Sequence, residues 1–166
     1  MRKSSSYYSG ATWEYVALDG TPGLGEGTSL AHGWASGPTS GLSKYVLGVR
    51  PVKAGYKKWF VEPQPADLTW AEGQVPTPFG PIQVNWKKSS DQFTLNLTVP
   101  DGTSGTVGVP LGGNQGSLVV NGHSVKGKRK TSDVTSTAEI ESRDGYVYLR
   151  DLAPGAYQIV APGTSE

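Results

Sequence analysis

The chain has 166 residues, and its 23 glycines and 12 prolines predict one main domain with many turns. Fifteen Lys and Arg residues against fourteen Asp and Glu residues give a formal net charge of +1, which argues against nucleic acid or an anionic membrane as a partner. The absence of cysteine excludes disulfide scaffolds, thiolate zinc sites and cysteine nucleophiles.

The first eight residues begin with charge but lack the apolar region of a secretory signal. No apolar run reaches transmembrane length either. We expect either a cytosolic product or a mature or excised segment with a new initiator methionine, and the sequence assigns no compartment.

Residues 28–48 carry apolar side chains at spacings compatible with one face of a helix. Thr28 or Ser29 could cap its start, and Gly48 is placed to end it. Gly37 and Pro38 interrupt the pattern, which predicts a kink or two short consecutive helices. The apolar face must pack on the rest of the chain, on a partner or on a second copy, so a homodimer through this face is one expectation.

Strands are expected from residue 56 onward. Strict alternation over 82–87 and 93–99 predicts two half-buried strands joined by a hairpin at 89–91. Shorter candidates are 56–61, 68–71, 106–109, 118–120, 146–150 and 157–161. Asn121-Gly122 is a strong hairpin signal, Pro154-Gly155 predicts a turn between the last two strands, and 131–142 is polar enough for an exposed loop.

These elements predict a mainly β fold, an antiparallel β-sandwich with a short N-terminal helical segment. We place the helical segment at residues 1–52 and the sandwich domain at 53–166. Two distant histidines without cysteine make poor metal ligands, so no metal or other cofactor is expected.

Two neighbouring motifs near the N-terminus suggest chemistry on a sugar. GATWEY places Glu14 beside Trp13, and SLAHGWASGP places His32 close to Trp34. A carboxylate can activate water in glycoside hydrolysis, and an indole ring can stack on a sugar face. The plainer interpretations are a solvated or capping Glu14, a hydrogen-bonded helix residue for His32, and core packing for at least one tryptophan.

The runs GATWEYVALDGTPG, TSLAHGWASGPTSGLSKYVLGVRPVKAGYKKWFVEPQP and LTWAEGQVPTPFGPIQVNWK, in this order, resemble the C-terminal end of α-L-rhamnosidases of glycoside hydrolase family 78. The resemblance is close over residues 10–87 and looser beyond. It implies the last helices of an (α/α)6 catalytic barrel followed by a C-terminal β-sandwich. It also implies inverting hydrolysis of terminal α-L-rhamnose, with Glu14 as general base and His32 as a sugar contact.

The resemblance places the general acid upstream, in barrel sequence that this chain lacks. The first hypothesis is therefore a rhamnosidase C-terminal protein or fragment without turnover of its own, whose partner is a rhamnose-containing glycoside or another carbohydrate. A second is a stand-alone carbohydrate-binding module that uses exposed tryptophans of the sandwich. Because alternation buries Trp86, Trp59 and Trp70 are the better candidates.

A third hypothesis is a small enzyme in which Glu14 and His32 form an acid/base pair in a pocket between helices and sandwich, completed across a dimer. Fold resemblance alone cannot define such a reaction. Three other features have plainer interpretations. His123 is expected at the surface, the basic run 126–130 in a solvated loop, and the Asn96 sequon on the outward side of its strand.

Overall fold

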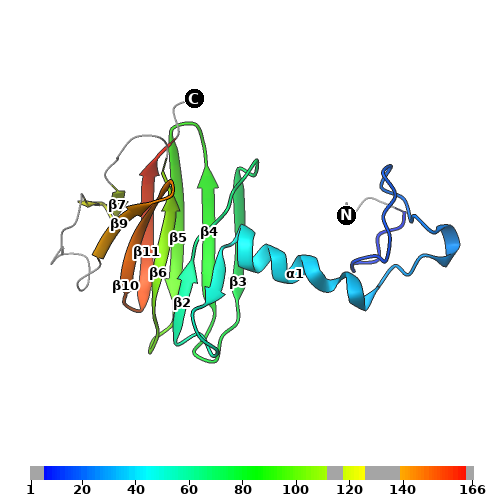
Figure 1. Ribbon diagram of the computed structural model, residues 1–166, viewed down its shortest axis with the longest axis horizontal. Helices are drawn as coiled ribbons and strands as arrows, with labels where there is room; N and C mark the ends of the chain where they lie inside the picture. The colour runs from blue at the N-terminus through cyan, green and yellow to red at the C-terminus, as the bar shows by residue number, and fades with distance from the viewer. Residues whose placement is uncertain (1–5, 112–117, 126–138, 164–166) are drawn as a thin grey trace. The chain divides into compact units, whose positions relative to one another are not determined.

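The computed structural model describes residues 6–111, 118–125 and 139–163 (Figure 1). Its backbone contacts divide it into two compact units, Met1–Gly41 and Leu42–Glu166. No helix in the described ranges is long and apolar enough to cross a membrane.

The first unit contains two 3₁₀ turns, Gly25–Gly27 and Gly33–Ser36, and the short helix α1, Gly37–Gly41. The helix expected over 28–48 therefore begins only at residue 33, because the backbone of residues 29–32 pairs with residues 12–14 instead. The expected break is confirmed, since the geometry changes at Gly37, and Pro38 lies in the first turn of α1, where proline is tolerated.

The second unit opens with a single π-type turn, Leu42–Val46, which continues directly into the sandwich. Gly48 ends this helical stretch with a positive φ of 80°. A side chain there would be strained, and its Cβ would also lie 2.2 Å from the carbonyl carbon of Glu62. Both constraints explain why glycine occupies the point where the helical turn meets the first strand.

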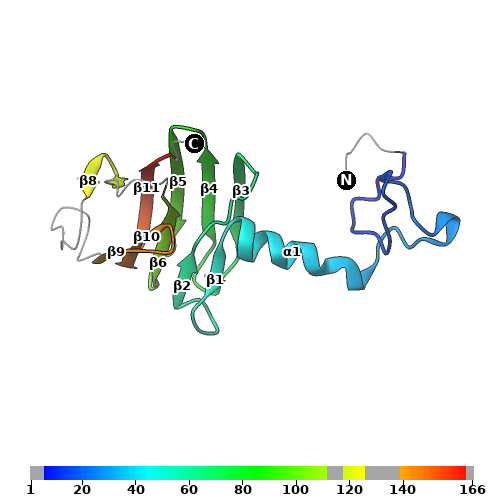
Figure 2. The same ribbon diagram turned by 45° about the horizontal axis from the view of Figure 1, so that its top comes forward.

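Two β-sheets face each other in the second unit (Figures 1 and 2). The five-stranded sheet contains, in spatial order, β1 (Val49–Pro51), β2 (Lys58–Val61), β6 (Ser104–Pro110), β10 (Tyr146–Leu152) and β9 (Glu139–Arg143). The six-stranded sheet contains β3 (Trp70–Val75), β4 (Ile82–Lys88), β5 (Gln92–Val99), β11 (Gly155–Pro162), β7 (Leu118–Val120) and β8 (His123–Val125). The expected β-sandwich is confirmed.

The pairing is antiparallel throughout these strands except between β2 and β6, which are parallel. Hairpins join β4 to β5 and β7 to β8, as the turn signals predicted. Pro154-Gly155 does lie between the last two strands, but these strands belong to different sheets.

Three strands were not among the predicted ranges, and one of them, β8, follows the predicted turn at Asn121-Gly122. β1 lies where the helical pattern was expected to end, and β9 includes residues 139–142 of the expected loop. The remainder of that loop, 131–138, and the basic run 126–130 lie outside the described residues. His123 and Asn96 are exposed, as expected.

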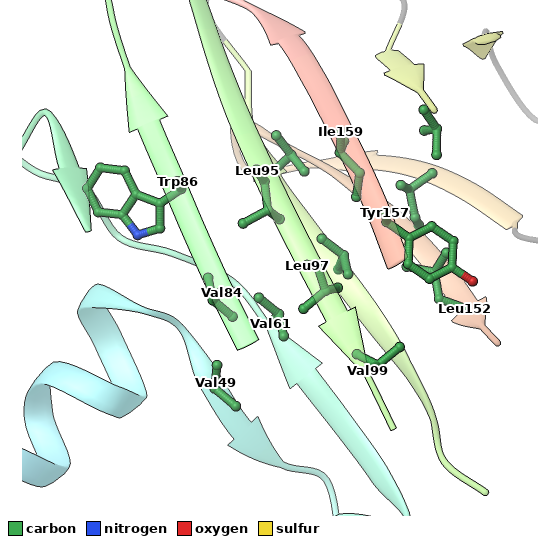
Figure 3. Close-up of a cluster of buried hydrophobic side chains, with 14 of the residues drawn as sticks. Val49, Val61, Val84, Trp86, Leu95, Leu97, Val99, Leu152, Tyr157 and Ile159 are labelled. Atoms are coloured by element: carbon green, nitrogen blue, oxygen red, sulfur yellow. The ribbon is translucent and has the colours of Figure 1, made fainter. Parts of the chain in front are cut away.

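The core fills the space between the sheets (Figure 3). Trp86 is fully buried, stacks on Phe93 at a centroid distance of 5.7 Å and donates its indole N–H to the Val46 carbonyl at 2.8 Å. The burial of Trp86 confirms the alternation argument. Its hydrogen bond also anchors the helical turn to the sheet, because it satisfies a polar group that would otherwise be buried without a partner.

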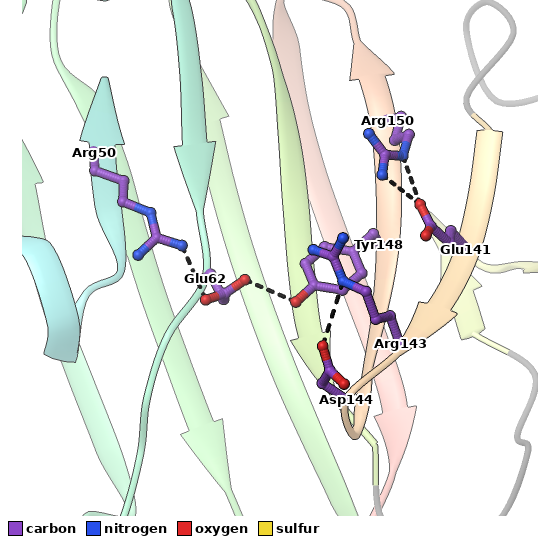
Figure 4. A network of polar contacts seen from close by, with 7 residues as sticks. All are labelled: Arg50, Glu62, Glu141, Arg143, Asp144, Tyr148 and Arg150. Carbon is purple, nitrogen blue, oxygen red and sulfur yellow. Dashed lines mark hydrogen bonds and ion pairs between the residues drawn. The ribbon is translucent and has the colours of Figure 1, made fainter. Parts of the chain in front are cut away.

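A polar network covers the outer side of the five-stranded sheet (Figure 4). Glu62 forms a 3.0 Å ion pair with Arg50 and accepts a 2.9 Å hydrogen bond from the Tyr148 hydroxyl. Arg143 lies 4.8 Å from the centre of the Tyr148 ring, in cation–π geometry. The network ties β1, β2 and β10 together through side chains.

Candidate functional site

The two sequence motifs meet in the first unit as neighbouring extended segments. The Glu14 N–H donates to the Ser29 carbonyl, and the His32 N–H donates to the Thr12 carbonyl, both at 2.9 Å. The loop between the segments is closed by a bridge between Val16 and Pro22. The backbone therefore brings the Glu14 and His32 motifs side by side, although they lie 18 residues apart in the sequence.

The Glu14 carboxylate is exposed and held by one backbone donor. Its Oε2 accepts a 3.2 Å hydrogen bond from the Ser29 N–H. Within the described residues, the other oxygen has no hydrogen-bond donor, so it is free to accept a proton from water. This arrangement is compatible with a general base, a role for Glu14 that stays a prediction.

Trp13 points to the other side of its segment and is only 4% exposed. Its indole N–H donates to the Ser9 hydroxyl at 3.0 Å, and Ser9 in turn donates to the Leu30 carbonyl. Tyr7 packs edge-on against the indole at 6.3 Å. Trp13 therefore packs within the small core of the first unit, as the plainer interpretation required of at least one tryptophan.

Trp34 differs sharply, because 96% of its side chain is exposed. His32, half-buried, meets it edge-on at a centroid distance of 6.0 Å. The pair presents an aromatic surface next to the Glu14 segment. Sugar contact by His32, Trp13 or Trp34 stays a prediction.

Asp19 is a second carboxylate of this unit, and it is already engaged. It accepts hydrogen bonds from the Thr21 N–H at 3.0 Å and from the Thr21 hydroxyl at 2.7 Å. These bonds, the backbone one first, lower the pKa of Asp19 below its ordinary value. A general acid must hold its proton near neutral pH, so Asp19 is unsuited to that role.

Of the two sandwich tryptophans that were expected to be exposed, Trp59 and Trp70, only Trp70 is exposed. Trp59 is fully buried and donates its indole N–H to the Thr103 hydroxyl at 3.0 Å, so its predicted role as an exposed sugar platform is wrong. It fits inside because Gly105 on the adjacent β6 has no side chain to occupy that space. Trp70 is 62% exposed and remains available.

One arrangement could not be predicted from the sequence. Four polar side chains on β3, β4, β5 and β11 lie directly opposite one another and form a row across the six-stranded sheet: Glu72, Asn85, Asn96 and Gln158. Alternation already indicated that residues 85 and 96 point away from the core. Their alignment with residues 72 and 158 depends on strand order and register, which no local pattern in the chain reveals.

No group of three or more His, Cys, Asp or Glu residues in the described ranges could hold a metal ion.

Comparison with known proteins shows which family the sandwich resembles. Residues 48–124 match the family model of the bacterial alpha-L-rhamnosidase C-terminal domain. The alpha-L-rhamnosidase of Alteromonas sp. (strain LOR) is 46% identical over 56 residues, which cover 33% of this chain and 6% of that protein. An alpha-L-rhamnosidase of Formosa agariphila is 28% identical over 131 residues, which cover 75% of this chain and 13% of that protein.

Solved structures agree on the fold. The alpha-L-rhamnosidase from Dictyoglumus thermophilum matches with a TM-score of 0.67 and 24% identity over 80% of this chain and 14% of that one. The Streptomyces avermitilis enzyme, solved with L-rhamnose, matches with a TM-score of 0.65 and 22% identity over 90% of this chain and 13% of that one.

The chain thus spans between 6% and 13% of the length of the curated relatives it matches. The matched residues run from Gly48, just before β1, to Ser124 in β8, and they include most strands of the sandwich. Residues 48–124 of this chain are therefore similar to the C-terminal domain of bacterial alpha-L-rhamnosidases.

Proposed function

We propose that the chain provides the C-terminal sandwich and one catalytic carboxylate, Glu14, of an α-L-rhamnosidase-type protein, and that it does not hydrolyse rhamnosides alone. The match of residues 48–124 to the rhamnosidase C-terminal domain supports the part of this proposal that concerns the sandwich. The role of Glu14 rests on the resemblance of the GATWEY motif to the family. The substrate would be a rhamnose-containing glycoside.

The chemistry supports a partial site. An inverting glycosidase needs a carboxylic acid that protonates the leaving oxygen and a carboxylate about 6.5–9.5 Å away that activates water. Glu14, exposed and anchored through Ser29, suits the second task. Asp19, which its hydrogen bonds to Thr21 keep ionised, does not suit the first. The general acid would come from sequence outside this chain, as the family resemblance implies.

A direct assay tests the absence of turnover. The purified chain and its Glu14→Gln variant are incubated with an aryl α-L-rhamnoside, and released phenol is followed. We expect no difference between the two proteins and no rate above buffer. Robust turnover that is abolished by Glu14→Gln would overturn the proposal and favour a complete small enzyme built around Glu14 and His32.

A chimera tests the positive part. The C-terminal region of the Alteromonas alpha-L-rhamnosidase is replaced by residues 10–166 of this chain, which include Glu14. The chimera should hydrolyse the rhamnoside, and Glu14→Gln in the chimera should lower kcat at least about 100-fold, the usual contribution of a general base. A folded chimera whose kcat does not depend on Glu14 would contradict the catalytic assignment.

A further inference from the structure

The exposed side of the six-stranded sheet carries an organised polar row. Glu72 lies opposite Asn85, Asn85 opposite Asn96, and Asn96 opposite Gln158, on four adjacent strands. With about 4.8 Å between neighbouring strands, the row is about 14 Å long. This length suits a short chain of linked ligand units better than a single small ion.

Hydrogen bonds hold the row in place. Asn85 donates its amide to Glu72 at 3.1 Å, and Gln158 donates its amide to Asn96 at 3.3 Å. Rigid strands with side chains already fixed by one another lose little entropy when a ligand binds. The row is therefore organised before any ligand arrives.

Each pair leaves groups for a ligand. Within the described residues, one Glu72 oxygen, the Asn85 carbonyl oxygen and the Asn96 amide nitrogen have no further hydrogen-bond partner. They offer acceptors and a donor side by side. A sugar hydroxyl both donates and accepts, so it matches this mixture, whereas a phosphate only accepts and needs several donors.

Trp70 lies on the same strand and the same side as Glu72, two residues away. Its side chain is 62% exposed, so the indole ring is accessible to a ligand. Two residues along a strand correspond to about 7 Å, so the ring flanks one end of the row. It offers a flat apolar surface of the kind that packs on the C–H face of a pyranose ring.

The row borders a shallow hollow of about 360 Å³, which is lined by Glu72, Gly73, Gln74, Gln83, Val84, Asn85, Asn96 and Thr98. Gly73 contributes only backbone on this side, because a Cβ at this position would point inward, 2.7 Å from Leu47. The volume falls within the usual range of small-ligand sites. One carboxylate and neutral amides dominate the lining, so the ligand should be uncharged.

From this combination we infer that the outer surface of β3, β4, β5 and β11 is a carbohydrate-binding site for a neutral oligosaccharide. Trp70 stacks on one sugar ring, and the row from Glu72 to Gln158 hydrogen-bonds to hydroxyls of the ring or rings beside it. The site does not involve Glu14 and does not depend on the proposed catalytic role.

Titration of the ¹⁵N-labelled chain, expressed in bacteria, tests the site. The probes are methyl α-L-rhamnopyranoside, a rhamnose-containing disaccharide and cellobiose, each raised to about 50 mM because single-surface sugar sites bind weakly. With at least one probe, we expect saturable shifts of the Trp70 indole and of the Asn85, Asn96 and Gln158 side-chain amides.

Variants then locate the binding. Trp70→Ala and Asn96→Ala should each raise Kd at least about tenfold, while Trp70→Phe keeps a flat ring and should recover most of the affinity. Gln64→Ala removes another exposed amide of the same unit, away from the row, and should leave Kd unchanged. Circular dichroism of each variant shows whether the sandwich is intact.

Three results would overturn the inference. The first is no shift at the row with any probe. The second is binding that Trp70→Ala and Asn96→Ala leave intact in folded protein. The third is a concentration-dependent dimer, abolished by Trp70→Ala, that buries this surface without binding sugar. Because the readout is binding and not hydrolysis, none of these outcomes bears on the catalytic role proposed for Glu14.

Discussion

The Tyr148 hydroxyl reaches across strand β6 to donate a 2.9 Å hydrogen bond to the Glu62 carboxylate (Figure 4). The strand between them makes room through Gly108. A Cβ at this position would lie 2.8 Å from the Tyr148 ring and 3.2 Å from the Glu62 side chain. A glycine in the middle of a strand is usually unfavourable, and here it permits a contact between strands that are not neighbours.

Because of this contact, we expect the free energy of unfolding to decrease at alkaline pH. Burial, and then the hydrogen bond to Glu62, raise the pKa of Tyr148 above the ordinary 10.0. The folded chain therefore holds this proton more tightly than the unfolded chain. Stability is fully present below pH 10 and falls as the pH rises through the higher pKa of the folded state.

Tyr148→Phe should lower the free energy of unfolding at pH 7 by about 1–2 kcal/mol, because Glu62 loses a donor. It should also make the loss of stability above pH 10 shallower. Urea unfolding at several pH values measures both effects, with the exposed Tyr45→Phe as control. An alkaline slope that Tyr148→Phe leaves unchanged would contradict the assignment.

Gly105 is expected to tolerate no side chain. A Cβ there would lie 2.2 Å from ring atoms of the buried Trp59. Gly105→Ala should destabilise the sandwich by about 2–3 kcal/mol through overpacking. Thr106→Ala, at the next position of β6, adds no atoms and should cost less than about 1 kcal/mol. Thermal unfolding compares the two, and equal losses would refute the steric explanation.

Asn121 has two roles in the β7–β8 hairpin. Its φ of +49° and the +82° of Gly122 suit a type I′ turn, and its side-chain oxygen accepts a 2.7 Å hydrogen bond from the Gln158 N–H. Asn121→Ala should cost about 1–2 kcal/mol. Asn121→Gly removes the strain of the positive φ but still loses the side-chain hydrogen bond. Its loss in free energy of unfolding, measured by chemical denaturation, should therefore be intermediate. Equal stability of the Ala variant and the unmodified chain would exclude both roles.

Trp13 and Trp34 should respond oppositely to truncation. Trp13→Ala removes the buried indole of a small unit, a change that typically costs about 3–5 kcal/mol. Amide exchange of the Glu14 and His32 N–H groups should then accelerate strongly. Trp34→Ala removes a side chain that is 96% exposed and should change stability by less than about 0.5 kcal/mol. Similar exchange in the two variants would argue against Trp13 as the anchor of this unit.

Local periodicity predicted the strands β4 and β5 of the six-stranded sheet well. Ile82, Val84 and Trp86 are all buried, because one side of β4 faces the core and the other faces solvent. The turn at Ser89 was also recognisable, since its polar residues separate two alternating runs. Where a strand is long and one-sided, the pattern alone is sufficient.

Short or polar strands gave no such signal. β1 has only three residues and begins directly after Gly48, where the helical pattern ends. β9 is mostly polar, and what shows it to be a strand is its pairing with β10. Trp59 was placed on the wrong side because β2 has four residues, too few to indicate which side is buried. The space that accepts Trp59 comes from Gly105, distant in the sequence.

The same limit applies to the candidate sites. The motifs around Glu14 and His32 were recognisable as neighbours in sequence, but their backbone pairing follows from the fold of the intervening loop. The row from Glu72 to Gln158 needs four strands in register, and one of them is the last strand of the chain. Such a surface becomes visible only when long-range pairing is known.

The position of β11 has a consequence for how this domain is made. Although it is the last strand in sequence, it lies between β5 and β7 in space. Until β11 is synthesised, the group of strands β3 to β5 and the β7–β8 hairpin cannot pair with each other, and one edge strand of each remains without its hydrogen-bonding partner. A stop codon before Gly155 would therefore do more than shorten the protein, because it would divide the six-stranded sheet into two parts with unpaired edge strands. Such edges pair with other chains, so we expect the truncated protein to aggregate or to be degraded.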